Sequence, residues 1–488
     1  MRTRFAPSPT GFLHVGGLRT ALFSYLIAKQ TKGDFVLRIE DTDQERSVPG
    51  AIENLLEVLH WAGLNLDEGV MMEKGVVTQK GSKGPYIQSE RLDLYKQYAE
   101  QLMESENVYP CFCSPDRLDE MRKAQQAKKQ PPMYDRLCCS LSKEKIKKKI
   151  DAGEKYVIRM KIPREQLITF NDEIRGKVEF RGDTIDDQVL MKSDGFPTYH
   201  LAHVVDDHLM DINMVIRGEE WISSLPKHLL LFQFLGWKEP RYAHVPLLLN
   251  KDKSKLSKRQ NDVATRDYIE KGYLPEALIN FLALLGWNPG TTDEIFSIED
   301  LIKQFSLDRV QKSGAIFDLE KLDWLQGQWM RKIPLKDFTN RIQALVEDKY
   351  SAAKNDLEFM DKAALIQERI TFFKEAPEMF SYFYEEPKVD KKLIVNEKQK
   401  VTADKAGEYL STTIKVLESI DEKKWSEETL KEKLFDLAEK KDYKRGQILW
   451  PMRAALTGLQ YSPGAFEVAS LLGKKIAIDR LKAALELF

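Results

Sequence analysis

The sequence predicts an α/β fold with a doubly wound parallel sheet, an α+β insertion and an all-α C-terminal region. Strand-like apolar runs alternate with helical patterns over residues 1–100, and the alternation resumes at residue 198. Residues 101–197 interrupt it, and residues 324–488 carry long helical patterns with few strand-like runs. A chain of 488 residues is too long for one core, which indicates several folding units.

The first element is a strand, a turn and a helix in direct succession. Residues 4–6 have the pattern of a strand end, and the prolines and glycine of residues 7–11 indicate a turn. The apolar residues that follow recur at helical spacing on one face: Leu18, Ala21, Leu22, Tyr25 and Leu26. The predicted helix therefore begins close to Gly16 and Gly17.

Later elements continue this pattern. Residues 35–39 are strand-like, residues 51–62 are helical, and residues 177–181 form a strand-like tract within the insertion. Residues 275–286 predict a helix with proline in its first turn and a glycine stop. The alternation is that of a Rossmann-like sheet, which binds ligands beyond the carboxyl ends of its strands.

The start of the first helix predicts a polyphosphate site. Gly16 and Gly17 carry no side chains, so an anion can approach the backbone N–H groups and the positive end of the helix dipole. His14 offers a further donor. The alternative for these residues alone is an ordinary glycine turn with a surface histidine.

A second segment, residues 250–259, is rich in cations. It holds five basic side chains among small polar residues: Lys251, Lys253, Lys255, Lys258 and Arg259. Such a loop suits anionic groups whose charge grows during a reaction, and a solvated lysine-rich loop is the alternative. Together, the two segments predict an ATP-phosphate site.

Composition limits the partners. Lys and Arg number 75 against 76 Asp and Glu, so any RNA contact must come from local basic patches. The lysine-rich run at 141–162 is one candidate patch, or a solvated helix face.

No apolar stretch has the length of a membrane span, and the first strand lies too near Met1 for a signal peptide, so we expect a cytoplasmic protein.

All four cysteines lie within one short window, as Cys111, Cys113, Cys138 and Cys139. In a reducing compartment this clustering indicates metal binding more than disulfides, with redox cysteines as the alternative.

The motifs resemble those of a known enzyme family. His14-Val15-Gly16-Gly17 and Lys255-Leu256-Ser257-Lys258-Arg259 are similar to the HIGH and KMSKS signatures of class I aminoacyl-tRNA synthetases. Residues 4–11, 38–43, 199–208, 217–221 and 446–458 resemble, in order, blocks of the bacterial glutamyl-tRNA synthetases. The resemblance covers nearly the whole chain.

This resemblance implies a reaction in which the α-carboxylate of glutamate attacks the α-phosphorus of ATP, and the resulting adenylate passes its glutamyl group to the 3′ end of tRNA(Glu). The implied catalytic residues are His14, Gly16, Gly17, Lys255 and Lys258. The implied ATP contacts, with Mg²⁺, are Ser8, His14, Gly16, Gly17, Lys255, Leu256, Ser257, Lys258 and Arg259. The implied glutamate contacts are Arg4, Ser8, Glu40, Tyr199, His203, Arg217 and Trp221.

Within that set the chemistry divides the roles. Glu40 suits the ammonium group of the amino acid. Arg4 and Arg217 suit its side-chain carboxylate, because guanidinium groups pair with carboxylates in a planar two-point geometry.

The resemblance also assigns the parts of the chain. Residues 1–100 and 198–323 would form the two halves of the catalytic domain, with the KLSKR loop in the second half. Residues 101–197 would bind the tRNA acceptor end, and residues 324–385 and 386–488 would form two helical anticodon-binding subdomains. A helical end favours the glutamyl enzymes over the glutaminyl enzymes, which use β-barrels there. Monomers are usual in the family.

Some members carry a zinc knuckle at the matching cysteines, with a histidine two residues beyond the third cysteine. Here that position is Ser140. Cys139, a water or Tyr134 would have to supply the fourth ligand, and a metal-free remnant is the alternative.

Several alternatives for function stay open. The chain could also charge tRNA(Gln), and neither Gln367 nor Arg369 can be aligned to decide this. It could be a glutaminyl enzyme, a nucleotidyltransferase acting on a small metabolite, or a non-catalytic tRNA-binding paralogue.

Overall fold

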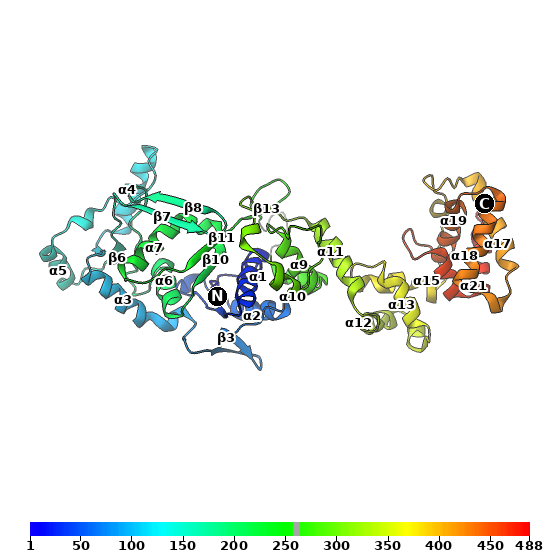
Figure 1. Ribbon diagram of the computed structural model, residues 1–488, viewed down its shortest axis with the longest axis horizontal. Helices are drawn as coiled ribbons and strands as arrows, with labels where there is room; N and C mark the ends of the chain where they lie inside the picture. The colour runs from blue at the N-terminus through cyan, green and yellow to red at the C-terminus, as the bar shows by residue number, and fades with distance from the viewer. Residues whose placement is uncertain (257–263) are drawn as a thin grey trace. The chain divides into compact units, whose positions relative to one another are not determined.

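The computed structural model describes residues 1–256 and 264–488. These residues form two compact units, Met1–Leu322 and Asp323–Phe488 (Figure 1). No helix among the described residues is both long and apolar enough to cross a membrane.

The first unit is built on an eight-stranded sheet. Its spatial order is β4 (Val76–Lys80), β3 (Glu68–Glu73), β2 (Phe35–Leu37), β1 (Thr3–Phe5), β10 (Met214–Gly218), β11 (Arg241–Val245), β7 (Leu167–Asp172) and β8 (Gly176–Arg181). The strands from β3 to β7 are parallel to their neighbours, and the two edge hairpins, β3–β4 and β7–β8, are antiparallel. The predicted parallel sheet is confirmed.

Two successive residues of β1 show that helices cover both faces of this sheet. The Thr3 hydroxyl donates to the Ser24 carbonyl of α1 (Val15–Gln30) at 2.9 Å. The Arg4 Nε donates to the Asp207 carboxylate of α6 (Tyr199–Leu209) at 3.3 Å. Because neighbouring side chains of a strand point to opposite faces, α1 and α6 lie on opposite sides of the sheet.

The predicted N-terminal elements are present. α1 contains the whole predicted apolar face, and β2 ends two residues before the predicted limit. α2 spans Ala51–Trp61, and α9 spans Pro275–Leu284. Gly286 follows α9 with a φ of +98°, a conformation that favours glycine and ends the helix.

The other helices of the first unit are α3 (Leu92–Glu104), α4 (Pro115–Ala127), α5 (Lys143–Asp151), α7 (Leu225–Phe234), α8 (Thr265–Lys271) and α10 (Ile298–Gln304).

A second, antiparallel sheet lies within the predicted insertion, in the order β5 (Val108–Cys111), β6 (Val157–Met160) and β9 (Val189–Met191). The tract at 177–181 does not belong to it. That tract forms β8, and its hairpin partner β7 joins the main sheet where Asp172 pairs with Tyr242 of β11. The local pattern identified a strand, but the sheet that its hairpin joins is set by long-range contacts that alternation does not encode.

The second unit is helical throughout; the structure describes all of its residues and assigns no strand there, which confirms the predicted all-α region. One hydrophobic cluster runs from Met330 to Phe380 and another from Tyr382 to Ala484. Its helices are α11 (Leu319–Lys332), which begins in the first unit, α12 (Leu335–Lys349), α13 (Phe359–Gln367), α14 (Ala376–Met379), α15 (Ser381–Tyr384), α16 (Lys391–Ile394), α17 (Ala403–Glu418), α18 (Glu427–Lys441), α19 (Arg445–Thr457), α20 (Ala465–Leu472) and α21 (Lys474–Leu485). The finer five-part division of the chain stays a prediction.

Candidate active site

A cavity of about 1530 Å³ lies at the carboxyl ends of the central parallel strands, with residues that end or follow β1, β2, β10 and β11 in its wall. This is where a doubly wound sheet binds its ligands. The predicted site residues that line it are Arg4, Ser8, His14, Gly16, Gly17, Glu40, Tyr199, Arg217, Trp221, Lys255 and Leu256. Segments from both ends of the first unit therefore meet around one space.

His14 is the N-cap of α1. Its Nδ1 accepts a hydrogen bond from the Gly17 N–H at 3.0 Å, which is the bond that a capping side chain makes to an otherwise unpaired helix donor. A nitrogen that accepts carries no proton, so the neutral ring is protonated at Nε2. His14 can thus close the helix with one nitrogen and donate with the other.

The two glycines leave room for this cap. A Cβ at Gly16 would lie 3.1 Å from the His14 Nδ1, and a Cβ at Gly17 would lie 2.8 Å from a methyl carbon of Leu13. The Gly17 N–H, which the sequence predicted as open to a phosphate, is taken by His14. Side-chain-free backbone is needed here for the imidazole as well as for any anion.

The second signature segment reaches the same cavity from both sides of residues 257–263. Before them, the backbone N–H of Leu256 donates to the Leu248 carbonyl of β12 (Leu248–Leu249) at 2.9 Å, and Lys255 lines the cavity. After them, Ala264 forms an antiparallel bridge with His14. The predictions for Ser257, Lys258 and Arg259 lie outside the described residues.

One of the five predicted cations has another partner. The Lys251 ammonium lies 3.1 Å from the Asp318 carboxylate and 2.8 Å from that of Glu320, and Lys251 does not line the cavity. Asp318 follows β13 (Ala315–Ile316), which pairs with β12, so the sheet brings these acids beneath the loop. Lys251, which is not among the predicted ATP contacts, therefore pairs with acids outside the cavity wall.

A buried charge network links two residues of the cavity wall, Arg4 and Glu40, with residues behind it. The Arg38 Nη2 donates to Glu40 at 3.1 Å and to Asp207 at 2.7 Å, and Arg4 also reaches Asp207. Burial raises the pKa of Glu40 to about 7, although Arg38 and Arg4 oppose that rise. Burial would also raise the pKa of Asp207, but the same two guanidinium groups outweigh it and hold that pKa well below its usual range. Asp207 is therefore the fixed anion, and Glu40 is poised to ionise near neutrality.

Arg217 forms its hydrogen bonds with neutral side chains. Its Nε donates to the His244 Nε2 at 3.0 Å, its Nη1 donates to the Tyr199 hydroxyl at 3.1 Å, and its Nη2 lies 3.4 Å from the His228 Nδ1. Its guanidinium carbon lies 6.0 Å from the ring centre of Trp221. Among the described residues no carboxylate forms an ion pair with Arg217, so its positive charge is uncompensated.

His203 does not line the cavity. It lies one helical turn after Tyr199 on α6, and the Tyr199 ring covers it with the two ring centres 4.8 Å apart. Its Nδ1 lies 3.3 Å from the Asp207 carboxylate, and burial lowers its pKa to about 4. His203 is thus a neutral support beneath the wall and not part of the wall itself.

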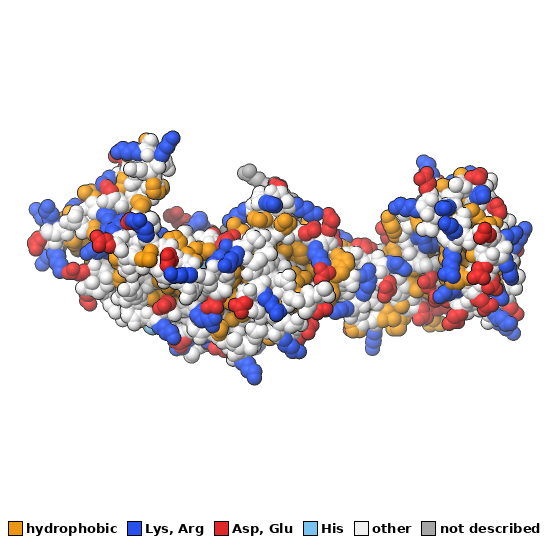
Figure 2. Space-filling view, turned by 45° about the horizontal axis from the view of Figure 1, so that its top comes forward, with side chains coloured by type: hydrophobic (Ala, Val, Ile, Leu, Met, Phe, Trp, Pro, Cys, Tyr) orange, Lys and Arg blue, Asp and Glu red, His pale blue; other side chains and the backbone are white. Residues whose placement is uncertain are grey.

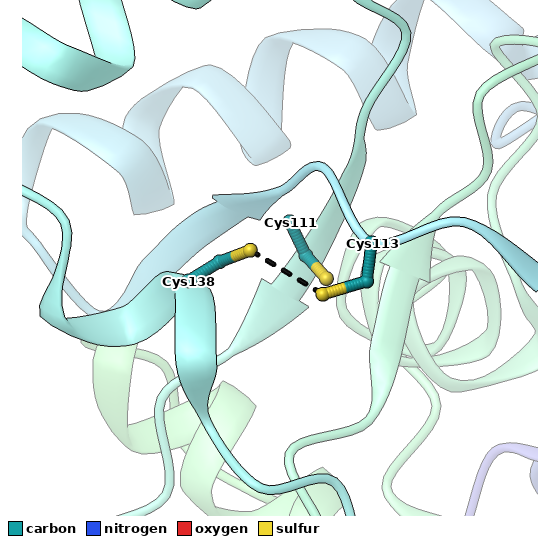
Figure 3. Close-up of side chains that lie close together, drawn as sticks. All are labelled: Cys111, Cys113 and Cys138. Carbon is teal, nitrogen blue, oxygen red and sulfur yellow. Dashed lines mark hydrogen bonds between the residues drawn. The ribbon is translucent and has the colours of Figure 1, made fainter. Parts of the chain in front are cut away.

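Three of the four cysteines come together (Figure 3). The sulfurs of Cys111, Cys113 and Cys138 lie within 4.8 Å of one another, close enough to share a metal ion. Cys139 is outside this group, and its assignment as fourth ligand stays a prediction. Cys138 and Cys139 are successive residues of a 3₁₀ turn, Leu137–Ser140, in which neighbouring side chains point about 120° apart.

Tyr134 contacts the same three cysteines. Its hydroxyl lies 3.3 Å from the sulfur of Cys111 and 3.3 Å from that of Cys113, and it accepts from the Cys138 N–H at 3.0 Å. The Phe112 N–H donates to the Cys138 sulfur at 3.4 Å.

Sequence reasoning gave no role to the residues behind the cavity wall. Asp172, His228 and His244 are buried and hold Arg217 directly or through one partner, and Asp207 holds Arg4. A signal was present for His244, a polar residue between Ala243 and Val245 near the carboxyl end of its strand. No local pattern marks Asp172 as its neighbour, because 72 positions separate them.

Comparison with known proteins gives one consistent result. The family described as tRNA synthetases class I (E and Q), catalytic domain, matches residues 1–324, and an anticodon-binding domain family matches residues 322–485. The chain is 45% identical to a glutamate–tRNA ligase of Prosthecochloris aestuarii, with 100% of this chain and 98% of that protein covered, and 44% identical to one of Clostridium botulinum, with 100% and 99% covered. A crystal structure of a glutamate tRNA ligase from Elizabethkingia meningosepticum, in complex with its amino acid, has a TM-score of 0.82 and 38% identity, covering 100% of this chain and 99% of that one.

Proposed function

The chain belongs to the class I tRNA synthetases of the glutamate and glutamine type, and from this premise we propose that it joins L-glutamate to the 3′ end of tRNA(Glu) with consumption of ATP. Its relatives over the full length are named glutamate–tRNA ligases. The reaction forms glutamyl-adenylate and diphosphate first, and then glutamyl-tRNA and AMP.

The observation that carries this proposal is the single cavity. It has the His14 helix start and Lys255 in its wall together with Arg4, Glu40 and Arg217. Its volume of about 1530 Å³ exceeds the roughly 300–1000 Å³ of a pocket for one small ligand. Two substrates that must react with each other therefore have room to lie side by side.

The phosphate end supplies charge and alignment. Attack of a carboxylate on the α-phosphorus builds negative charge on phosphate oxygens, and little proton transfer is required. We assign the stabilisation of that charge to the His14 Nε2–H, the N-terminus of α1 near Gly16, and Lys255, and we carry over the same role for Lys258. Mg²⁺ that accompanies ATP adds counter-charge to the phosphate oxygens.

The amino-acid end supplies selection. Ionised Glu40 would pair with the ammonium group, while Arg217 and Arg4 face the side-chain carboxylate. Arg217 suits this role best, because its protein partners are neutral and its charge stays available. A glutamine side chain would offer that charge a neutral amide, which pairs more weakly than a carboxylate.

For tRNA we propose two contacts in the separate units. On the insertion, α5 carries lysines, and Figure 2 shows basic side chains spread over this part of the molecule. Lys143 and Lys149 pair with acids, whereas Lys145, Lys147 and Lys148 form no ion pair with any described residue. These three suit phosphate oxygens of an acceptor end.

In the second unit we propose that Arg369 is the anticodon-facing residue of its stretch. Gln367 is buried and donates to the Met330 and Ile333 carbonyls at 3.0 and 2.7 Å, whereas Arg369 is exposed. Parallel charging of purified tRNA(Glu) and tRNA(Gln) tests whether the chain also accepts the second tRNA.

We also propose that the cysteine cluster holds a structural zinc ion through Cys111, Cys113 and Cys138, with Tyr134 or water as the fourth ligand. Tetrahedral zinc with bonds of about 2.3 Å places its sulfurs about 3.8 Å apart. The Cys113 and Cys138 sulfurs are 3.5 Å apart and all three sulfurs lie within 4.8 Å of one another, so small shifts of the side chains suffice to meet this geometry. Bound zinc would tie the strand end at Cys111 to the 3₁₀ turn at Cys138.

Transfer of radiolabelled glutamate to total tRNA, with ATP, tests the central proposal. We expect label in acid-precipitable tRNA, dependent on ATP and sensitive to ribonuclease. Exchange of diphosphate into ATP without transfer would indicate a nucleotidyltransferase, and tRNA binding without either reaction would indicate a non-catalytic paralogue.

A further inference from the structure

Arg217 is fixed by a buried pair on two other strands. Its Nε donates to the His244 Nε2 at 3.0 Å, and the His244 Nδ1 lies 2.6 Å from the Asp172 Oδ2. His244 belongs to β11, and Asp172 is the last residue of β7. The side chains of both are fully buried. The three residues stand on three neighbouring strands, β7, β11 and β10, and connect Asp172 across the sheet to Arg217 in the cavity wall.

The hydrogen-bond donors and acceptors of Arg217, His244 and Asp172 are compatible with only one position of the proton on the His244 ring. An arginine nitrogen only donates, so the His244 Nε2 must accept and carries no proton. The proton of the neutral ring is then on Nδ1, where it is donated to Asp172. Burial and the facing Arg217 charge lower the pKa of His244 although Asp172 opposes them, which keeps the ring neutral.

Asp172 is itself oriented by backbone. Its Oδ1 accepts from the N–H groups of Ile174 and Arg175 at 3.0 and 2.9 Å. The other oxygen, Oδ2, is thereby directed at His244. Hydrogen bonds from His244 and from this turn outweigh burial and lower the pKa of Asp172, so the group is an anion.

We propose that Asp172 and His244 are positioning residues that set the guanidinium of Arg217 for the side-chain carboxylate of the substrate. They hold Arg217 through a neutral imidazole, so the negative charge of Asp172 stays one residue away from the guanidinium. A carboxylate in direct contact with Arg217 would compete with the substrate. This inference rests on the proposed function, because it assigns Arg217 to glutamate.

The Asp172→Asn variant tests the pair through the tautomer of His244. The two backbone N–H groups require an oxygen at the Oδ1 position, so the new NH₂ group must face His244. It would donate to Nδ1, move the ring proton to Nε2 and present an N–H to the Arg217 N–H. Side-chain volume is unchanged, so a packing effect is excluded.

Glutamate-dependent ATP–diphosphate exchange is the assay, with KM determined separately for glutamate and for ATP. We expect the KM for glutamate to rise by about 10- to 100-fold, as for loss of a hydrogen bond to a charged group, with the KM for ATP within about twofold of its original value. Glu173→Gln is the matched control, since Glu173 adjoins Asp172 in the same turn but pairs with the exposed Arg241. It should leave both constants unchanged.

A KM for glutamate within about twofold of the original in a folded Asp172→Asn protein would overturn the proposal, as would an equal rise in both constants.

Nitrogen NMR of the histidine-labelled parent protein gives a second test that needs no variant. We expect a neutral His244 ring protonated at Nδ1, and a ring protonated at Nε2 or at both nitrogens would also overturn it. If the parent protein transfers no glutamate to tRNA, the proposed function fails, and not only this inference.

Discussion

Replacement of Arg217 by methionine should remove the selective charge of the amino-acid site and leave the phosphate site intact. Methionine keeps most of the length and apolar bulk of the arginine stem but has no charge and no donor. The three acceptors around Arg217 belong to His244, Tyr199 and His228, none of them a carboxylate. The variant therefore leaves no unpaired anion of its own in the protein.

The size of the effect follows from what the substrate loses. A carboxylate left without its charged partner in a desolvated site costs about 3–5 kcal/mol, or about 10²- to 10⁴-fold. Arg4 remains in the cavity wall, although it is shared with Asp207, so we expect the lower half of that range. For folding, three hydrogen bonds of about 1 kcal/mol each are lost, and a buried methionine returns about 1.5–3 kcal/mol. The fold should persist.

Steady-state ATP–diphosphate exchange, with glutamate and with glutamine, measures this directly. We expect kcat/KM for glutamate to fall by about 10²- to 10³-fold, the preference for glutamate over glutamine to collapse, and the KM for ATP to stay constant. A folded Arg217→Met protein that keeps kcat/KM for glutamate within about tenfold would refute the assignment. So would a loss that appears equally in the KM for ATP.

Three further predictions concern the other groups. His14→Asn should keep the cap on Gly17 and the melting temperature, while its turnover falls by about 10²-fold or more. His14→Ala should lose turnover and also about 1 kcal/mol of unfolding free energy. Full turnover in the asparagine variant would remove the Nε2–H from the mechanism. The kcat/KM for glutamate should rise with pH through about 7, because Glu40 must be ionised to bind the ammonium and burial holds its pKa near that value; a flat profile from pH 6 to 8, or a rise that survives in Glu40→Gln, would contradict this. Metal analysis should find about one zinc per chain, retained in Cys139→Ser and lost in Cys138→Ser, and equal retention in both variants would exclude the cluster as a zinc site.

The same Glu40 shift has a consequence for stability. Its pKa in the folded protein lies above the ordinary value of 4.5, so the folded state binds a proton more tightly than the unfolded state does. This contribution to the unfolding free energy is fully present below about pH 4.5 and is lost as pH rises to about 7. Glutamate binding is therefore expected to be strongest at a pH above about 7, where Glu40 contributes least to the unfolding free energy.

Local pattern was sufficient for the elements of the fold that depend on local forces. The apolar spacing after Gly17 predicted α1, and proline and glycine delimited α9. The place in the main sheet of the hairpin that contains the strand at 177–181 was not predictable, because its first strand, β7, joins the sheet through the pairing of Asp172 with Tyr242, 70 positions apart. Strand pairing is a long-range property, and only the fold selects it.

The candidate site divides in the same way. Residues in motifs, such as His14 and Arg217, could be carried over from a resemblance. The capping bond between His14 and Gly17 could not, because it depends on the ring orientation at the first turn of the helix. The sequence left the fourth ligand open among Cys139, Tyr134 and water for a related reason, since spacing in sequence does not reveal the direction of a side chain in a 3₁₀ turn.

The hairpin β7–β8 has a consequence for how this molecule can be cut and grafted. By residue number the hairpin lies inside the segment 101–197. Its Asp172 carboxylate nevertheless holds the His244 imidazole, which supports Arg217 in the proposed glutamate pocket. A chimaera that exchanges the whole segment for that of a relative would exchange one end of this support as well. The interchangeable module is therefore the three-stranded sheet with its cysteine cluster, and the hairpin must stay with the parent scaffold.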